Sequence, residues 1–179
     1  MPDINFPVLH TSRLSLVELQ PQHAPAFFRL MTDVRVTEFY FVHDFEKEED
    51  LRPVIGFFET QFEAGKGIRW GITLQGSEDI IGTIGYRNII PGHKGTVLFA
   101  LMPEYHNKGY ITEALTAIVQ FGTERLGLRR IEAEVRPGNI ASKVVLKKAG
   151  FTYEGLLRQW VQWNGQHYDM EMYSLINKG

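Results

Sequence analysis

The feature that most constrains the fold is a nearly continuous apolar run, GTVLFALM at residues 95–102, followed by a lone glycine, Gly109, ahead of a helical pattern. A strand that is apolar on both faces is covered on both faces, so this run predicts an inner strand of a sheet. Glycine forms helices poorly, but it lacks a Cβ and lets a backbone approach a ligand closely. The segment HNKGYITEAL (106–115) is therefore either an ordinary strand-to-helix turn or a helix entrance that holds a ligand.

An anion is the ligand that such an entrance favours. The first N–H groups of a helix have no partner inside it, and the helix dipole makes that end positive. A pyrophosphate accepts hydrogen bonds from such groups, and Lys108 adds positive charge nearby. The chain contains no GxxxxGK[ST] and no GxGxxG pattern, which argues against mononucleotide and Rossmann dinucleotide sites. We therefore expect a different phosphate-bearing cofactor at Gly109, with the ordinary turn as the alternative.

The remaining patterns predict one mixed α/β domain over residues 1–179. Asn139 and Gly150 have the residue types of a helix N-cap and C-cap. The pair Asn164–Gly165 between strand-like residues predicts a hairpin. The expected strands are 11–19, 68–75, 80–90, 95–102 and 129–135, followed by the hairpin, and the expected helices are 21–33, 46–64, about 110–126 and 139–150.

Composition excludes several classes of function. The 179 residues include no cysteine, so disulfides, thiolate metal sites and a cysteine nucleophile are ruled out. The net charge of −2 argues against a broad basic surface for nucleic acid. The six histidines show no HxH or HxxxH spacing, so we expect no metal site. The N-terminus lacks signal-peptide regions and no segment is apolar enough to span a bilayer, so we expect a cytoplasmic protein without a membrane partner.

A resemblance to a known family is carried by two segments, FALMPEYHNKGYITEAL and NIASKVVLKKAGF. They resemble the GNAT superfamily of acetyl-CoA-dependent N-acetyltransferases, and within it the ribosomal-protein N-acetyltransferases of the RimJ/RimL type. The first segment is similar to that family's (Q/R)xxGx(G/A) pyrophosphate loop preceded by P-E-Y. The other segment resembles its NxxSxxxxxxxGF helix, here Asn139, Ser142, Gly150 and Phe151. TSRLSL near the start and NGQHYDMEMYSL near the end are also similar to this branch. His106 stands where the family has Gln or Arg, and Ile111 where it has Gly or Ala.

The resemblance implies a single-domain GNAT fold of the α/β (α+β) class. This fold has a mixed, mostly antiparallel sheet of about seven strands, about four flanking helices and splayed central strands. Acetyl-CoA is the implied cosubstrate, with its pantetheine arm paired to the backbone of strand 95–102 like an added strand. The implied cofactor-binding residues are Leu98, Phe99, Ala100, Leu101, Met102, His106, Asn107, Lys108, Gly109, Tyr110, Ile111, Thr112 and Asn139. The strand residues could equally be ordinary core residues, and Asn139 could be an ordinary helix cap. Lys143, Lys147 and Lys148 are expected either to be solvated or to contact the ribose phosphate.

The implied reaction is acetyl transfer to an uncharged primary amine. Deprotonation at pH 7 costs about 1.4 kcal/mol for an α-amine with a pKa of about 8, but roughly 4.6 kcal/mol for a lysine with a pKa of about 10.4. The family's usual glutamate base corresponds here to Thr96, which leaves Glu132, Glu134 or an ordered water as alternatives. The usual tyrosine acid corresponds to Leu146. In the RimJ/RimL branch a serine serves instead, and Ser142 matches it, although a serine there also satisfies backbone groups in the first turn of a helix.

The resemblance makes the N-terminal α-amine of a ribosomal or other protein the first choice of acceptor. The alternatives are a small amine such as a polyamine or aminoglycoside, a non-catalytic acyl-CoA-binding module, and a plain α/β protein without cofactor. A homodimer stays open. The implied acceptor walls are the segment TEFYF (37–41) and four hairpin aromatics, each of which also fits a core: Trp160, Trp163, Tyr168 and Tyr173.

Overall fold

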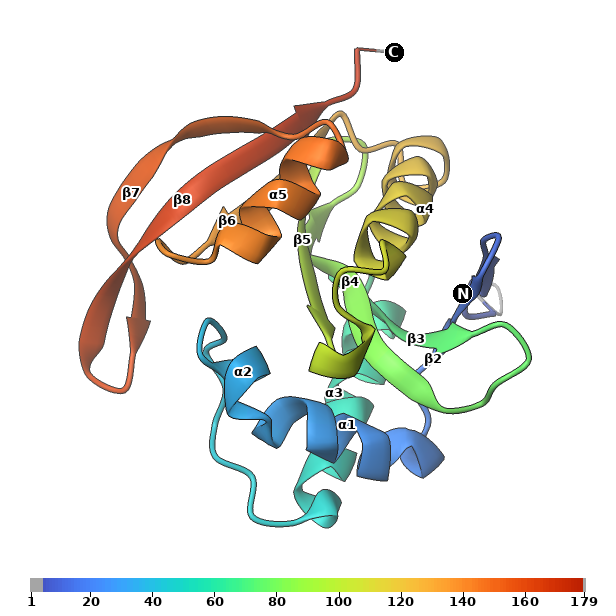
Figure 1. Ribbon diagram of the computed structural model, residues 1–179. Helices are drawn as coiled ribbons and strands as arrows, with labels where there is room; N and C mark the ends of the chain where they lie inside the picture. Colours follow the sequence, from blue (N-terminus) through green and yellow to red (C-terminus); the bar gives the residue numbers. More distant parts are fainter. Residues whose placement is uncertain (1–4, 179) are drawn as a thin grey trace.

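The computed structural model describes residues 5–178, which form one eight-stranded sheet in the order β1-β2-β3-β4-β5-β6-β8-β7 (Figure 1). All neighbouring strands are antiparallel except β5 and β6, which are parallel. The strands are β1 (Leu9–His10), β2 (Leu14–Glu18), β3 (Ile68–Leu74), β4 (Ile80–Ile90), β5 (Lys94–Leu101), β6 (Arg130–Val135), β7 (Thr152–Trp163) and β8 (Gln166–Ile176). The helices are α1 (Ala24–Thr32), α2 (Val34–Thr37), α3 (Leu51–Glu63), α4 (Tyr110–Glu124) and α5 (Ile140–Lys148), with short 3₁₀ turns η1 (Pro21–His23), η2 (Glu48–Asp50) and η3 (Pro103–Tyr105).

Two hydrophobic clusters cover the two faces of the sheet. Because side chains alternate along a strand, β5 contributes Val97 and Leu101 to one cluster and Ala100 to the other. The first cluster joins the strands to α4 and α5, and the second joins them to α1 and α3. Figure 1 shows α1 and α2 in the lower part of the molecule and α4 and α5 in the upper part. The predicted inner position of β5 is confirmed.

Two local predictions are confirmed in detail. Asn139 is the N-cap of α5, and its Oδ1 accepts a hydrogen bond from the Ser142 N–H at 3.0 Å. Asn164 and Gly165 both have positive φ, 47° and 74°, as a tight two-residue turn between β7 and β8 requires. These signals act within a few residues, so the sequence displays them directly.

Three expectations need correction. The sheet has eight strands rather than about seven, because residues 9–10 pair with β2 as a two-residue strand. The expected helix 21–33 is divided into η1 and α1, and Asp33 then caps the short α2. Strand 95–102 ends at Leu101, and Leu98 and Phe99 are only half-buried because they line cavities.

The central strands β5 and β6 separate part of the way along their length. They pair in register from Lys94 with Arg130 to Val97 with Ala133, and no further. Beyond that point β5 continues beside β4 to Leu101, and β6 continues beside β8 to Val135. The Met102 N–H donates to Ile81 O at 2.9 Å, so by antiparallel alternation the backbone groups of Phe99 face the opening. The splay implied by the family resemblance is present.

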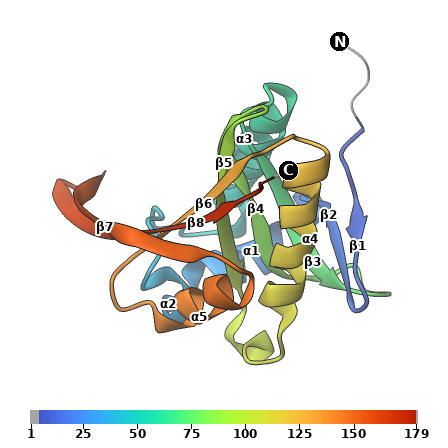
Figure 2. The ribbon, with the colours of Figure 1, turned by 90° about the horizontal axis from the view of Figure 1, so that it is seen from above.

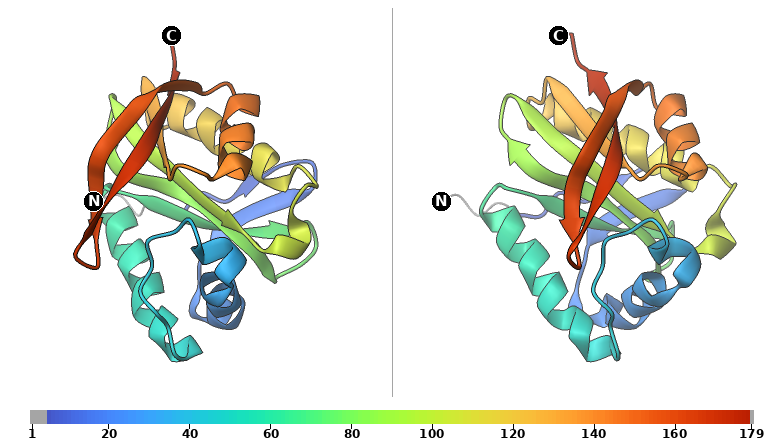
Figure 3. Two further views of the ribbon diagram at one scale, coloured as in Figure 1. Left: turned by 60° about the vertical axis from the view of Figure 1, so that its left-hand side comes forward. Right: turned by 90° about the vertical axis from the view of Figure 1, so that its left-hand side faces the viewer.

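The β7–β8 hairpin projects from the sheet at the side away from β1, as Figure 2 shows. Its tip reaches the segment between α2 and α3 (Figure 3). The Phe41 ring packs against Trp163 and Tyr168, with centroids 6.1 Å and 5.0 Å away. Among residues 5–178, no helix is both long and apolar enough to cross a membrane.

Candidate active site

Two cavities meet where β5 and β6 separate. The first, which we call the loop groove, has a volume of about 600 Å³ and extends from the Gly109 loop past the end of β5 to α5. The second, which we call the inner cavity, has a volume of about 450 Å³ and lies between β5, β6, α1, α3 and the hairpin. The two share five lining residues: Phe39, Tyr40, Phe99, Asn139 and Ser142.

The loop groove contains the helix entrance at Gly109. Gly109 is the N-cap of α4 with φ of 80°, and Asn107 also has a positive φ of 60°. The first hydrogen bond of the helix runs from the Glu113 N–H to Gly109 O at 3.0 Å, so the N–H groups of Tyr110, Ile111 and Thr112 have no partner inside the helix. A Cβ added at Gly109 would lie 3.4 Å from Arg13 Nη2. The arrangement fits a diphosphate.

A clamp between residues far apart in the sequence holds this entrance. Glu113 Oε1 accepts hydrogen bonds from the Thr11 and Ser12 hydroxyls at 2.6 Å and 3.0 Å, and Oε2 accepts one from Arg13 Nε at 2.7 Å. Arg13 Nη1 also donates to Lys108 O at 2.9 Å. Partial burial acts to raise the pKa of Glu113, but the hydrogen bonds from Thr11, Arg13 and Ser12 outweigh it and lower that pKa to about 2. From the sequence, the segment TSRLSL was expected to begin a strand and to resemble the family, but its role in holding the α4 entrance was not predicted.

The loop groove brings together most of the residues expected at the cofactor. Its walls include Phe99, Ala100, Leu101, His106, Asn107, Gly109, Tyr110, Ile111, Thr112 and Asn139. Leu98 lines the inner cavity instead. Within the described chain, Lys108 and Met102 line neither cavity: Lys108 Nζ lies 5.4 Å from the Tyr105 ring centre, and Met102 is buried in the α1–α3 cluster.

The structure explains the two positions at which this sequence differs from the family's loop pattern, Ile111 and His106. Ile111 is only 8% exposed and packs into the first hydrophobic cluster, between the sheet and α4, so most of its side chain points away from the groove. His106 Nε2 lies 2.9 Å from Leu101 O, and since a carbonyl only accepts, Nε2 carries the proton. His106 therefore fixes the end of β5. Of the lysines on α5, Lys148 lines the groove, while Lys143 forms an ion pair with Glu171 at 2.6 Å.

Ser142 occupies the place where the two cavities join. It lies in the first turn of α5, half-buried, and its backbone N–H is held by Asn139. Its hydroxyl forms no hydrogen bond to any other residue in the part of the chain that the structure describes. Leu146, one turn further along the same helix face, is fully buried and lines the inner cavity. Ser142 is thus the polar side chain of α5 that faces both cavities.

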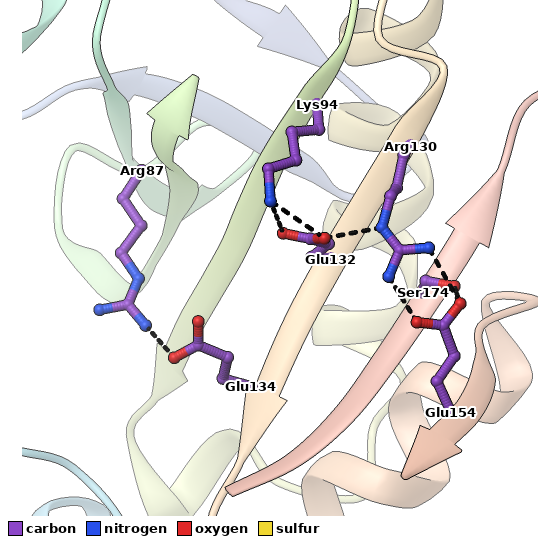
Figure 4. A network of polar contacts seen from close by, with 7 residues as sticks. All are labelled: Arg87, Lys94, Arg130, Glu132, Glu134, Glu154 and Ser174. Atoms are coloured by element: carbon purple, nitrogen blue, oxygen red, sulfur yellow. Dashed lines mark hydrogen bonds and ion pairs between the residues drawn. The ribbon is translucent and has the colours of Figure 1, made fainter. Parts of the chain in front are cut away.

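The three candidate positions for the general base differ in whether they line a cavity and in what they pair with. Thr96 is 3% exposed and, within residues 5–178, lines neither cavity. Glu132 lies between Lys94 Nζ at 3.1 Å and Arg130 Nε at 2.6 Å (Figure 4). Burial acts to raise the pKa of Glu132, but its hydrogen bonds to Arg130 and Lys94 lower it overall. Glu134 alone of the three lines the inner cavity, where it pairs with Arg87 at 2.8 Å.

Arg69 in the inner cavity was not predicted from the sequence. Arg69, Gly85 and Leu98 lie in register across β3, β4 and β5. Because Gly85 has no side chain, Arg69 can extend over it, and its Nη1 lies 3.4 Å from Leu98 O. The only signal in the sequence was a charged residue inside an otherwise apolar strand, IRWGITL.

Only some of the aromatic residues expected to line the acceptor site lie at the inner cavity. Trp163 lines the inner cavity together with Phe39, Tyr40 and Phe41. Trp160 is 54% exposed, and Tyr173 is buried in the first hydrophobic cluster. In residues 5–178 no three His, Asp or Glu side chains are grouped to hold a metal ion.

Comparison with known proteins agrees with this architecture. The family described as "Acetyltransferase (GNAT) domain" matches residues 13–152. The uncharacterized N-acetyltransferase YoaA of Bacillus subtilis (strain 168) is 36% identical over 172 residues, which cover 96% of this chain and 97% of that protein. Among solved structures, an acetyl transferase of Salmonella typhimurium that modifies the N-terminal serine of ribosomal protein L7/L12 has a TM-score of 0.85 at 21% identity, covering 96% of this chain and 100% of that one. RimL, a ribosomal L7/L12 α-N-protein acetyltransferase in complex with coenzyme A, has a TM-score of 0.82 at 21% identity, covering 95% and 98%. The family match and the relative aligned over nearly its whole length show that this chain belongs to the GNAT family and is an N-acetyltransferase.

Proposed function

We propose that the enzyme transfers an acetyl group from acetyl-CoA to the N-terminal α-amine of a ribosomal or other protein. The observation that carries the proposal is the meeting of the loop groove and the inner cavity at Ser142 and Phe99, beside the opening between β5 and β6. One cavity offers an anion-binding helix entrance, and the other offers room for an acceptor. The solved relatives named above, which act on a ribosomal protein N-terminus, support this choice of acceptor.

The chain's own residues fit acetyl-CoA along the loop groove. The free N–H groups of Tyr110, Ile111 and Thr112 would receive the diphosphate. The backbone of Phe99, which faces the opening, would pair with the amides of the pantetheine arm. This placement brings the end of the arm toward Ser142, which lines both cavities.

Acetyl-CoA supplies the acetyl group as a thioester, and the acceptor amine must be neutral to form the new C–N bond. The amine loses one proton and the departing sulfur gains one. We assign the donation of the proton to sulfur to Ser142 Oγ, because Ser142 lines both cavities. We assign the proton of the amine to Glu134, or to a water that it orients, because Glu134 lines the inner cavity, where it pairs with Arg87. An α-amine needs only about 1.4 kcal/mol to deprotonate at pH 7, so a weak base suffices.

The test is release of free coenzyme A in the presence of peptides with a free or a blocked N-terminus, followed by mass spectrometry of the products. We expect acetylation of the α-amine and none of internal lysines. If only polyamines were acetylated, the acceptor would be a small amine rather than a protein N-terminus. Binding of acetyl-CoA without release of coenzyme A from any amine would contradict a catalytic role.

A further inference from the structure

The inner cavity carries an excess of positive charge. Its charged walls are three arginines, Arg69, Arg87 and Arg136, and one carboxylate, Glu134. Two of the three guanidinium groups already have partners. Arg87 pairs with Glu134 at 2.8 Å, and Arg136 Nη1 donates to Glu38 O at 2.6 Å. The Arg136 guanidinium also lies over the Phe41 and Tyr168 rings, 5.4 Å and 5.1 Å from their centres.

Like Arg136, Arg69 has no carboxylate partner in residues 5–178, but its one hydrogen bond is also long. A guanidinium offers five N–H donors, and Arg69 uses one in a long contact of 3.4 Å to Leu98 O. Its other neighbours are the Phe58 ring, 5.3 Å away, the Tyr40 hydroxyl, which favours its charged form, and Arg87, whose charge opposes its own. Burial lowers the pKa of Arg69 below its usual range, and the nearby Tyr40 hydroxyl offsets only part of that effect.

A second unsatisfied group lies beside it. The Tyr40 hydroxyl is close to the Arg69 guanidinium, yet it is buried and completes no hydrogen bond of ordinary geometry within the described chain. Buried polar atoms are usually paired, and an unpaired one in a cavity wall points to a missing partner. A planar carboxylate can accept two parallel bonds from a guanidinium and one from a hydroxyl. It therefore satisfies both groups at once.

We infer that the acceptor carries a carboxylate close to its reacting amine, and that Arg69 and Tyr40 bind it. This inference rests on the proposed acetyl transfer and narrows its acceptor. Arg69 reaches Leu98 O, and Leu98 precedes Phe99, which lines both cavities, so the bound carboxylate lies near the meeting point. The carboxylate is either that of an amino acid acceptor or that of an acidic side chain near a protein N-terminus. Polyamines are disfavoured, since the same wall repels them.

The experiment measures kcat/KM from coenzyme A release with matched acceptors. One arm compares amidated peptides with Asp or Asn at the second position, and the other compares single amino acids with free or amidated carboxyl groups. We expect the wild type to prefer the carboxylate form about ten- to a hundredfold in one of the two arms. The arm that shows the preference identifies the source of the carboxylate.

Three variants and one control test which residues cause the preference for the carboxylate form. Arg69→Met removes the preference but retains turnover of the amide form and affinity for acetyl-CoA. Arg69→Lys keeps part of the preference, because it has charge without the planar fork. Tyr40→Phe lowers the preference several-fold. Arg52→Met, an exposed arginine on α3, leaves it unchanged.

A binding measurement decides the inference even if no acceptor turns over. With coenzyme A present, the N-acetylated acceptor in its carboxylate form should raise the Tm of the wild type, but not that of Arg69→Met. The Tm of Arg69→Met alone should not fall below that of the wild type, because the substitution removes a buried charge without a counter-ion. Equal wild-type activity toward the carboxylate and amide forms would overturn the inference and leave the proposed function intact. Equal losses of activity toward both forms in Arg69→Met would have the same consequence. Absence of coenzyme A release with every amine would instead overturn the proposed function, and the Tm comparison would still decide the carboxylate site.

Discussion

The clamp at the entrance of α4 allows a quantitative prediction for Glu113→Gln. Glutamine resembles the protonated acid, so the variant lacks the stabilisation that the charged carboxylate receives from Thr11, Ser12 and Arg13. The pKa of Glu113 falls from an ordinary value of 4.5 to about 2, and its side chain is only 16% exposed. A shift of roughly two and a half units at 1.36 kcal/mol each corresponds to about 3 kcal/mol of folding free energy at pH 7.

The sign of the pH dependence follows from the lowered pKa. Because the folded-state pKa lies below the unfolded-state value, the contribution is complete above pH 4.5 and is lost as the pH falls through about 2. We therefore expect the free energies of unfolding of the wild type and Glu113→Gln to differ by about 3 kcal/mol at pH 7 and to converge below about pH 4.

Urea denaturation followed by the fluorescence of Trp70, which is fully buried, measures both quantities. Glu59→Gln, an exposed glutamate within α3, is the matched control and should change the unfolding free energy by less than about 0.5 kcal/mol. A loss below about 1 kcal/mol in Glu113→Gln at pH 7 would refute the clamp. So would a difference that stays constant down to about pH 3.

Four further variants test the site. Gly109→Glu should weaken acetyl-CoA binding at least tenfold through charge and bulk, whereas Gly109→Ala should mainly cost about 1 kcal/mol of stability from the positive φ; calorimetric titration and urea unfolding separate the two. Ser142→Ala should lower kcat more than it changes the affinity for acetyl-CoA, and full retained turnover would remove Ser142 as the acid. Asn139→Ala should destabilise the protein by about 1 kcal/mol through loss of the α5 cap, and an unchanged urea midpoint would show that the cap contributes nothing.

Sequence reasoning succeeded where the determining interactions are local. The Asn139 cap involves Ser142 three residues on, and the hairpin turn depends on two adjacent residues that adopt positive φ. The inner position of β5 followed from an uninterrupted apolar run. The splay of β5 from β6 was expected only through the family resemblance, since no residue pattern in either strand marks where pairing stops.

The missed features depend on distant segments. Glu113 meets residues about a hundred positions away, so its partners become visible only once β2 lies beside α4. The role of Arg69 depends on the register of three strands, which puts Gly85 between it and Leu98. Glu132 and Glu134 lie two apart on one strand and were equal candidates by sequence, but only Glu134 lies beyond the point where β5 leaves β6.

A crystal structure of the protein with coenzyme A tests the central claim most directly. We expect diphosphate oxygens within hydrogen-bonding distance of the Tyr110, Ile111 and Thr112 N–H groups, with the arm beside Phe99 and the sulfur near Ser142. A diphosphate bound elsewhere on the molecule, with those three N–H groups left to solvent, would contradict it.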